Sequence, residues 1–347
     1  MATTPALCAT PPVSGGEPEY QTKPLPNLIA TLWWFLRRFA TPTEMKQRLA
    51  LIIGVTLMAL SGHMTLAQTR ITDDEIRNIL RDRVDRAKKN VGIVVGLVDE
   101  KGVRVIAYGK PSTHSTQTVN GDTVFEIGSI SKVFTTLLLA DMVERGEVGL
   151  DDPISKYLPA SVKVPSRGGK EITLRHLAMH ASGLPGMPDN FWGPASFVKW
   201  QLTCPFCRNA DYVGDRYAKY SLDKMYEFLS SYQLKQDIGR NYEYSNYGNA
   251  LLGQILVLRS GMDYETLVRS RISQPLRMEN TRVQLTPEMQ SRLAIGYNEA
   301  ERRVRSWDMA AFAPAGGLRS TANDLLKFVA ANLGLTPARL LSKTEKP

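Results

Sequence analysis

A serine and a lysine three positions apart, Ser129 and Lys132, have the spacing that most clearly predicts covalent chemistry in this chain. Residues three apart on a helix lie on one face, so the hydroxyl and the amine can meet, whereas Ser131 points elsewhere. A serine hydroxyl is a poor nucleophile until a base takes its proton. A lysine amine can be that base where burial lowers its pKa, and the apolar run 133–140 supplies such a setting. The alternative is a serine that only caps the helix and a lysine on the surface.

A tyrosine and an asparagine two positions apart, Tyr244 and Asn246, form a second group that can support the same chemistry. A tyrosine held beside a lysine ammonium can act as a phenolate base and later as an acid. An asparagine side chain can hydrogen-bond both to a lysine and to a substrate amide. The alternative places Tyr244 as a half-buried aromatic residue before a helix, with Asn246 as the N-cap of that helix.

The hydrophobic spacing predicts one β-hairpin followed by a mostly helical body that must position these residues. The first candidate serine follows Gly128, which permits a sharp entry, so Ser129 is expected at a helix N-terminus, where the partial positive charge favours an oxyanion. A long loop rich in proline, glycine and aromatic residues is expected over 182–220. The hairpin is expected over 91–98 and 103–108, and helices over 72–89, 129–145, 173–180, 221–233, 246–260 (ending at Gly261) and 321–333.

Four blocks of the sequence resemble the class C β-lactamase and D,D-peptidase group, the peptidase S12-like serine hydrolases, of which S-x-x-K is a signature. The blocks begin FEIGSISKVF (125–159), LRHLAMHASGLP (174–185), YEYSNYGNALLGQIL (242–256) and GGLRSTANDLLKF (316–328). They occur in the order of the family, and the similarity extends from about 91 to 335. The resemblance implies an α+β (α/β) fold, in which an antiparallel sheet is flanked by helices and joined to a mainly helical subdomain.

The resemblance also implies a role for each candidate residue. Ser129 is expected to be the acylated nucleophile. Lys132 and Tyr244 are expected to form the proton-transfer pair, and Asn246 is expected to bind the substrate amide. The implied substrate is a small molecule, either a β-lactam or a D-alanyl peptide of the peptidoglycan type, and neither a cofactor nor a metal is implied.

The third motif of the family, a lysine or histidine two positions before a glycine, has no counterpart after Asn246. In the family this motif follows a block like 316–328, on a strand that lines the pocket opposite the serine and supplies a backbone N–H to the oxyanion hole. We therefore expect a hydrolase domain over 68–347 that is truncated before this motif and lacks the C-terminal strands, which leaves only the hairpin. Two functions stay open: an exported serine hydrolase acting through a Ser129 acyl-enzyme, and a non-turnover penicillin-binding sensor or inactive truncated relative.

The first 67 residues are expected to be processed rather than to fold with the rest. Residues 1–44 are a low-complexity segment and an aromatic run, predicted to be a non-native or disordered leader. A basic stretch, the apolar run 49–60 and small residues up to Ala67 predict a secretory signal over 45–67. The alternative is an uncleaved membrane anchor over 49–67. The domain is thus expected to be periplasmic or secreted, or anchored and facing the periplasm.

Charge and composition exclude other classes. The chain has 43 basic and 34 acidic residues, a net charge of +9, and its basic residues are spread along the sequence, so no nucleic-acid partner is expected. A hydrophobic content of 43% excludes a disordered chain. Cys204 and Cys207 predict a local disulfide in an oxidising compartment, with free thiols as the alternative. His176 and His180 stand four apart but lack the glutamate of a zinc motif, so no metal site is predicted.

Overall fold

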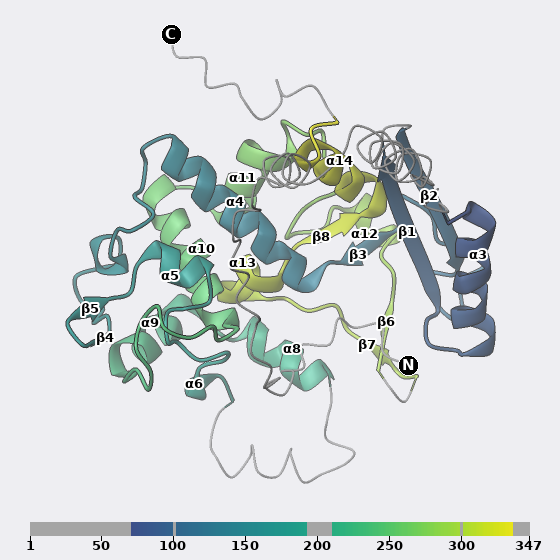
Figure 1. Cartoon of the computed structure of the whole chain (residues 1–347). Coiled ribbons are helices and arrows are strands. Elements are labelled where there is room, and N and C mark those ends of the chain that lie inside the picture. The colour runs from purple at the N-terminus through teal and green to yellow at the C-terminus, as the bar shows by residue number, and fades with distance from the viewer. Residues whose placement is uncertain (1–70, 100–101, 193–209, 299–300, 336–347) are drawn as a thin grey trace, which may run out of the picture. The chain divides into compact units, whose positions relative to one another are not determined.

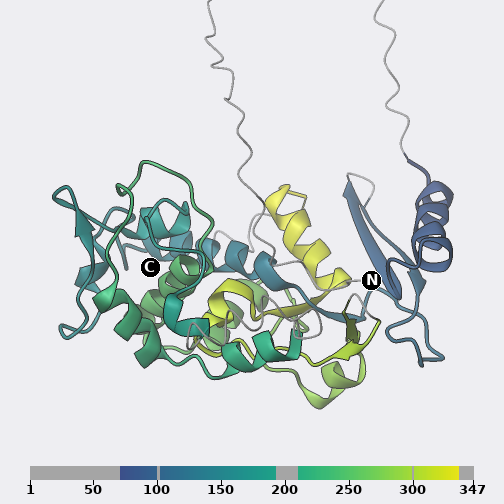
Figure 2. The same ribbon diagram turned by 90° about the horizontal axis from the view of Figure 1, so that it is seen from below.

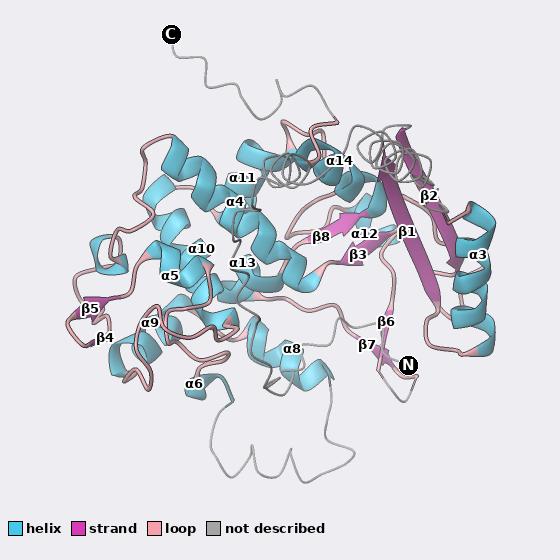
Figure 3. Ribbon diagram, in the orientation of Figure 1, coloured by secondary structure: helices cyan, strands magenta, loops and turns pink. Residues whose placement is uncertain are grey.

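Helices make up most of the regular structure, as the hydrophobic spacing predicts, and apart from one long hairpin the strands are two or three residues long (Figures 1 and 3). The computed structural model describes residues 71–99, 102–192, 210–298 and 301–335. The architecture is α+β, as expected. All the described helices and strands lie in the compact unit that begins at Asp73.

Three expectations concern residues outside the described ranges. They are the leader over 1–44, the signal or anchor over 45–67, and the pairing of Cys204 with Cys207. Among the helices that are described, none combines the length and the apolar content needed to cross a membrane. The described ranges also contain no group of three or more histidine, cysteine, aspartate or glutamate residues that could hold a metal ion.

The predicted hairpin is confirmed, with strands β1 (Gly92–Asp99) and β2 (Gly102–Gly109) pairing antiparallel from Gly92 opposite Gly109 to Asp99 opposite Gly102. Side chains alternate between the two faces of a strand, and each face of this hairpin has its own helix. Ile106 faces helix α3 (Asp73–Arg81), whereas Gly96 lies against Leu326 of helix α14 (Ala322–Asn332). Two views at right angles show the hairpin between these two helices (Figures 1 and 2).

The hairpin is not the only strand pair, so that expectation was wrong. Strand β3 (Val124–Glu126) pairs antiparallel with strand β8 (Arg319–Thr321). Each partner is three residues long, which is too short to give an alternating pattern in the sequence. The pairing matters for the site because Ser129 follows β3 closely, while β8 follows the segment that contacts Lys132.

Helix α10 (Asn246–Ser260) has the predicted bounds, and both of its ends have a local cause. The hydroxyl of Ser245 accepts a hydrogen bond from the backbone N–H of Gly248 at 2.7 Å, so the N-cap is Ser245 and not Asn246. At the other end Gly261 adopts a left-handed φ of 69°, which favours glycine. The helix packs against α4 (Ser131–Glu144), α5 (Leu174–Ala178) and α13 (Ala313–Gly316).

Helix α10 approaches α13 very closely at Gly253. A Cβ atom at this position would lie 2.1 Å from the Cβ of Pro314, which is far inside van der Waals contact. The absence of a side chain therefore sets the distance between the two helices. Leu252 and Leu256 of the same helix are fully buried in the main hydrophobic core.

Two predictions about the extent of helices were wrong. Helix α3 ends at Arg81, and a π-helical turn over Asp82–Arg86 follows, so the helical segment stops short of residue 89. The segment expected to be a loop over 182–220 contains helices α6 (Asp189–Trp192) and α8 (Ala210–Ala218). These two helices meet through aromatic rings, with the ring centroids of Phe191 and Tyr217 4.8 Å apart.

The remaining elements are short, apart from α9, and complete the helical body. They are η2 (Gly128–Ile130), η3 (Ile154–Lys156), β4 (Ser166–Arg167), β5 (Lys170–Glu171), α9 (Leu222–Ser231), α11 (Tyr264–Val268), η4 (Arg269–Ser273), α12 (Pro287–Ser291), β6 (Gly296–Tyr297), β7 (Arg303–Val304) and η5 (Ala310–Phe312). The helices predicted over 173–180, 221–233 and 321–333 are confirmed as α5, α9 and α14, each somewhat shorter than predicted.

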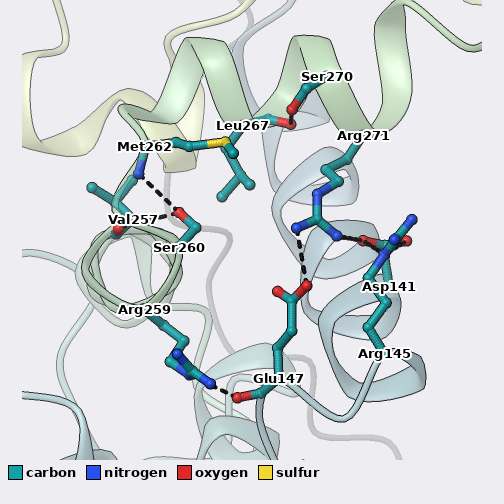
Figure 4. Close-up of polar contacts among 10 residues, drawn as sticks. All are labelled: Asp141, Arg145, Glu147, Val257, Arg259, Ser260, Met262, Leu267, Ser270 and Arg271. Atoms are coloured by element: carbon teal, nitrogen blue, oxygen red, sulfur yellow. Dashed lines mark hydrogen bonds and ion pairs between the residues drawn. The ribbon is translucent and has the colours of Figure 1, made fainter.

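An ion-pair network lies at the C-terminal end of α4 (Figure 4). Arg271 donates to the carboxylates of Asp141 and Glu147, at 3.0 Å in each case. Arg145 donates to both oxygens of the Asp141 carboxylate at 2.9 Å, and Arg259 donates to the backbone carbonyl of Glu147 at 2.8 Å. The network therefore ties α4 to α10 and to the turn after α11.

Candidate active site

Ser129 lies in a tight turn between strand β3 and helix α4. Gly128 has a left-handed φ of 52°, a conformation that glycine adopts without steric cost. The serine belongs to the 3-10 turn η2, and α4 begins two residues later at Ser131, so the helix starts later than predicted. The Oγ atom of Ser129 lies 3.1 Å from Nζ of Lys132 and 2.8 Å from the phenol oxygen of Tyr244. The structure thus brings together three of the four predicted site residues around one oxygen.

Lys132 is a buried cation without a carboxylate partner among the described residues. Its side chain is 6% exposed, and its amine donates to Oγ of Ser129 and, at 2.7 Å, to the carbonyl oxygen of Ala315. Burial lowers the pKa of Lys132 from its ordinary 10.5 to about 7. Because the charged and neutral forms are then comparable at neutral pH, a neutral amine is available to accept the hydroxyl proton of Ser129.

Tyr244 is half-exposed and precedes α10. The amine of Lys132 lies 4.9 Å from the centroid of its ring, so the tyrosine stands beside the lysine as expected. Burial raises the pKa of Tyr244, and the smaller effect of its hydrogen bond to Ser129 does not reverse this. The phenol is therefore protonated at rest, which leaves Lys132 as the better proton acceptor.

Asn246 occupies the first position of α10. Its amide nitrogen lies 3.9 Å from the sulfur of Met187, a weak acceptor. Its Oδ1 atom is buried and has no hydrogen-bond partner in the described structure. The expected hydrogen bond to Lys132 is absent from the contacts of the described residues, where the lysine amine uses Ser129 and Ala315 instead. A buried amide oxygen without a donor can accept one from a ligand.

A match to known proteins decides the family. The family model described as Beta-lactamase matches residues 76–346. The chain belongs to the β-lactamase family. A β-lactamase of Escherichia coli K12 is 28% identical over 80% of this chain and 65% of that protein. The D-alanyl-D-alanine-carboxypeptidase/endopeptidase AmpH of the same organism is 27% identical over 81% of this chain and 68% of its own length.

Solved structures of β-lactamase-related proteins share this fold. The β-lactamase/D-alanine carboxypeptidase of Yersinia pestis, complexed with citrate, superposes with a TM-score of 0.62 at 27% identity, covering 75% of this chain and 68% of that one. A class C β-lactamase of Rhodobacter sphaeroides superposes with a TM-score of 0.60 at 27% identity, covering 78% and 70%. The chain thus has the α+β fold of the serine β-lactamases and spans about two-thirds of the length of these relatives.

One wall of the candidate site was not predicted from the sequence: it is formed by the segment that leads into β8. Besides the Ala315 carbonyl on Lys132, the Leu318 N–H donates to the buried hydroxyl of Ser131 at 3.1 Å. The carbonyl of Pro314 accepts from Thr135 at 2.8 Å. Ser131 therefore does point away from Ser129, as expected, and it fixes this segment against α4. No pattern in the sequence marks these contacts, because most of them use backbone atoms.

Arg319, in strand β8, stabilises the same wall through hydrogen bonds to three neighbouring segments. It is 8% exposed, and its guanidinium donates to the carbonyls of Val283 at 2.6 Å and Trp307, and to the carboxylate of Glu126 at 3.2 Å. The ion pair joins β8 to β3, since Glu126 and Arg319 face each other across the strand pair. A buried arginine with this many acceptors is a structural group, and only its position inside the block 316–328 could have drawn attention to it.

Proposed function

We propose that this protein is an exported serine hydrolase that opens a β-lactam or a D-alanyl peptide through an acyl-enzyme on Ser129. The observation that carries the proposal is that Oγ of Ser129 lies within hydrogen-bond distance of both Lys132 and Tyr244. Relatives named as β-lactamases and as a D-alanyl-D-alanine-carboxypeptidase/endopeptidase support the substrate classes. Export rests on the signal predicted over 45–67.

The first step is acylation. The neutral amine of Lys132 takes the hydroxyl proton of Ser129 while Oγ forms a bond to the substrate carbonyl carbon, and the π electrons move to the carbonyl oxygen. When the carbonyl re-forms, the C–N bond breaks and its electron pair goes to nitrogen. The protonated phenol of Tyr244 donates its proton to that nitrogen, and the new ammonium of Lys132 balances the phenolate.

The second step is hydrolysis of the acyl-enzyme. A water molecule gives a proton to the phenolate of Tyr244 and attacks the acyl carbon. The ester bond to Oγ then breaks, and the serine oxygen takes back the proton held by Lys132. Asn246 would contribute binding, since its unpartnered Oδ1 can accept the N–H of an amide side chain on the substrate.

Covalent capture of a fluorescent penicillin tests the proposal, with turnover of a chromogenic cephalosporin as the second readout. We expect wild-type protein to be labelled and Ser129→Ala to be unlabelled. Ser131→Ala is the matched control, because it removes a nearby serine hydroxyl that points into the wall, and it should still be labelled. Mass spectrometry should place the adduct on Ser129.

Two outcomes contradict the proposal: labelling of Ser129→Ala as strong as that of the wild type, or no labelling and no turnover in the wild type. Labelling with turnover supports the hydrolase. Labelling without turnover of the cephalosporin supports a slow peptidase or a sensor that stops at the acyl-enzyme.

A further inference from the structure

His180 lies directly beside the segment that carries Tyr244. The histidine has a left-handed φ of 57°, a conformation that non-glycine residues seldom adopt. Its carbonyl oxygen accepts from the backbone N–H of Glu243 at 2.7 Å, and its Nδ1 accepts from the backbone N–H of Ser245 at 3.1 Å. The residues on either side of Tyr244 are therefore both hydrogen-bonded to the same histidine.

The imidazole ring also contacts Tyr244 itself. The two ring centroids are 4.7 Å apart with an interplanar angle of 32°, and the ring of Tyr242 meets the imidazole edge-on at 5.7 Å. Because Lys132 lies 4.9 Å from the same Tyr244 ring, the phenol is located by an imidazole and an amine together. Tyr244 otherwise lies outside any helix or strand and is 41% exposed.

We propose that His180 is a positioning residue for Tyr244, which it holds at Ser129 through two backbone hydrogen bonds and one ring contact. This inference rests on the proposed function. A proton donor must lie within hydrogen-bond reach of the atoms that it serves, and a displacement of about 1 Å can cost 10²-fold in rate. The three contacts of His180 restrict the segment at the position where such a displacement would occur.

The protonation state of His180 suits this role. An Nδ1 atom that accepts a hydrogen bond carries no proton, so the neutral ring has its proton on Nε2. Burial and, second, the charge of Lys132 lower the pKa of His180, and both favour the neutral ring. A protonated ring would lose the acceptor for Ser245 and place a second cation near the lysine.

Two variants separate the contacts of the histidine. His180→Gly keeps the left-handed backbone but removes both the ring and the Nδ1 acceptor. His180→Asn also tolerates this backbone and offers a side-chain oxygen to the N–H of Ser245, but has no ring. His176→Ala is the matched control, because His176 caps α5 in the same segment through Thr173 and, among the contacts of the described residues, makes none with Tyr244.

The rate of Ser129 acylation by a lactam probe is the first readout. We expect His180→Gly to lower it about 10- to 100-fold, His180→Asn to lower it less, and His176→Ala to leave it unchanged. In a Tyr244→Phe background, His180→Gly should change the rate less than about twofold, because the group it positions is gone. A full loss in that background, or a loss in His180→Gly no larger than in His176→Ala, would overturn the inference.

A spectroscopic readout keeps this test separate from the test of activity. In protein with carbon-13-labelled tyrosine, the Tyr244 resonance is the one missing from Tyr244→Phe. We expect its chemical shift and its titration to change in His180→Gly and to stay unchanged in His176→Ala. If the wild type is never acylated, the proposed function fails while this measurement still decides the role of His180. An unchanged Tyr244 resonance in folded His180→Gly overturns that role.

Discussion

A buried positive charge lies near each end of helix α4, and in the described structure only one of the two is paired with carboxylates. Near the first residue of α4, Lys132 is 6% exposed and donates only to a hydroxyl and a carbonyl. Near the last residue, the guanidinium of Arg271 is also largely buried, with 17% of the side chain exposed, but it is paired with Asp141 and Glu147 (Figure 4). One cation is left uncompensated and the other is neutralised by two carboxylates.

This difference explains which end can perform proton transfer. A cation held by carboxylates keeps its proton, and an arginine keeps it in any protein environment. A buried lysine without a carboxylate loses its proton near neutral pH, because burial disfavours the charged form. The first arrangement contributes stability, whereas the second costs stability and makes a base available.

The largest expected effect comes from Lys132→Met, which removes the amine and keeps the length of the side chain. We expect the acylation rate to fall about 10³-fold, because Ser129 loses its proton acceptor. At pH 6 the free energy of unfolding should increase by roughly 2 kcal/mol, because a buried charge is removed at the cost of its hydrogen bonds. Stopped-flow labelling and urea denaturation measure the two changes.

Lys156→Met is the control for this substitution. Its amine is exposed and pairs with Asp152, so the same chemical change there should leave acylation unaltered.

The gain in stability of Lys132→Met should disappear as the pH rises from about 7 to 10.5. Over that range the wild type becomes more stable, because the unfolded lysine still binds a proton that the folded one has lost. A gain that is independent of pH would contradict the buried charge.

The next effect is the pH dependence of acylation in the wild type. Because the pKa of Lys132 is about 7, the rate should fall about tenfold per pH unit below that value and level off above it. The raised pKa of Tyr244 means that loss of the phenol proton should not limit the rate at moderately alkaline pH. The rate constant for labelling, measured from pH 5 to pH 9, checks this. A rate that is flat down to pH 5 would show that the amine is not the base.

The smallest expected effect comes from the C-terminal end of α4, where Arg271 is paired with two carboxylates. Arg271→Met breaks the ion pairs with Asp141 and Glu147, and we expect it to lower the free energy of unfolding by about 1–2 kcal/mol and to leave acylation unchanged. Arg240→Met breaks an exposed pair with Asp237 and should change stability by less than about 0.5 kcal/mol. Loss of acylation in Arg271→Met, measured on folded protein, would mean that the two ends of α4 are not independent.

Local patterns made the candidate site predictable. The three-residue spacing of Ser129 and Lys132 places both side chains together, and the bounds of α10 follow from Ser245 and Gly261 at its ends. The hairpin was predictable because β-branched runs flank a turn. In each case the residues that decide the structure are close in the sequence.

The features that were missed depend on contacts between distant residues. The pairing of Val124 with Thr321 and the carbonyl of Ala315 on Lys132 join segments that share no pattern. Helices α6 and α8 lie in a segment whose composition favours loops, and aromatic packing around Phe191 holds them. The raised pKa of Tyr244 was not predictable, because it depends on burial, which the sequence does not reveal.

The close approach at Gly253 links the two halves of the site mechanically. Helix α10 starts at Asn246 and touches Pro314 at Gly253, and the next residue after that proline supplies the carbonyl that holds Lys132. A methyl group added at position 253 would push α10 and Pro314 apart. The shift of Pro314 would move the carbonyl of Ala315, and with it the amine of Lys132. The distance between Lys132 and the start of α10 therefore depends on Gly253, a residue that contacts neither.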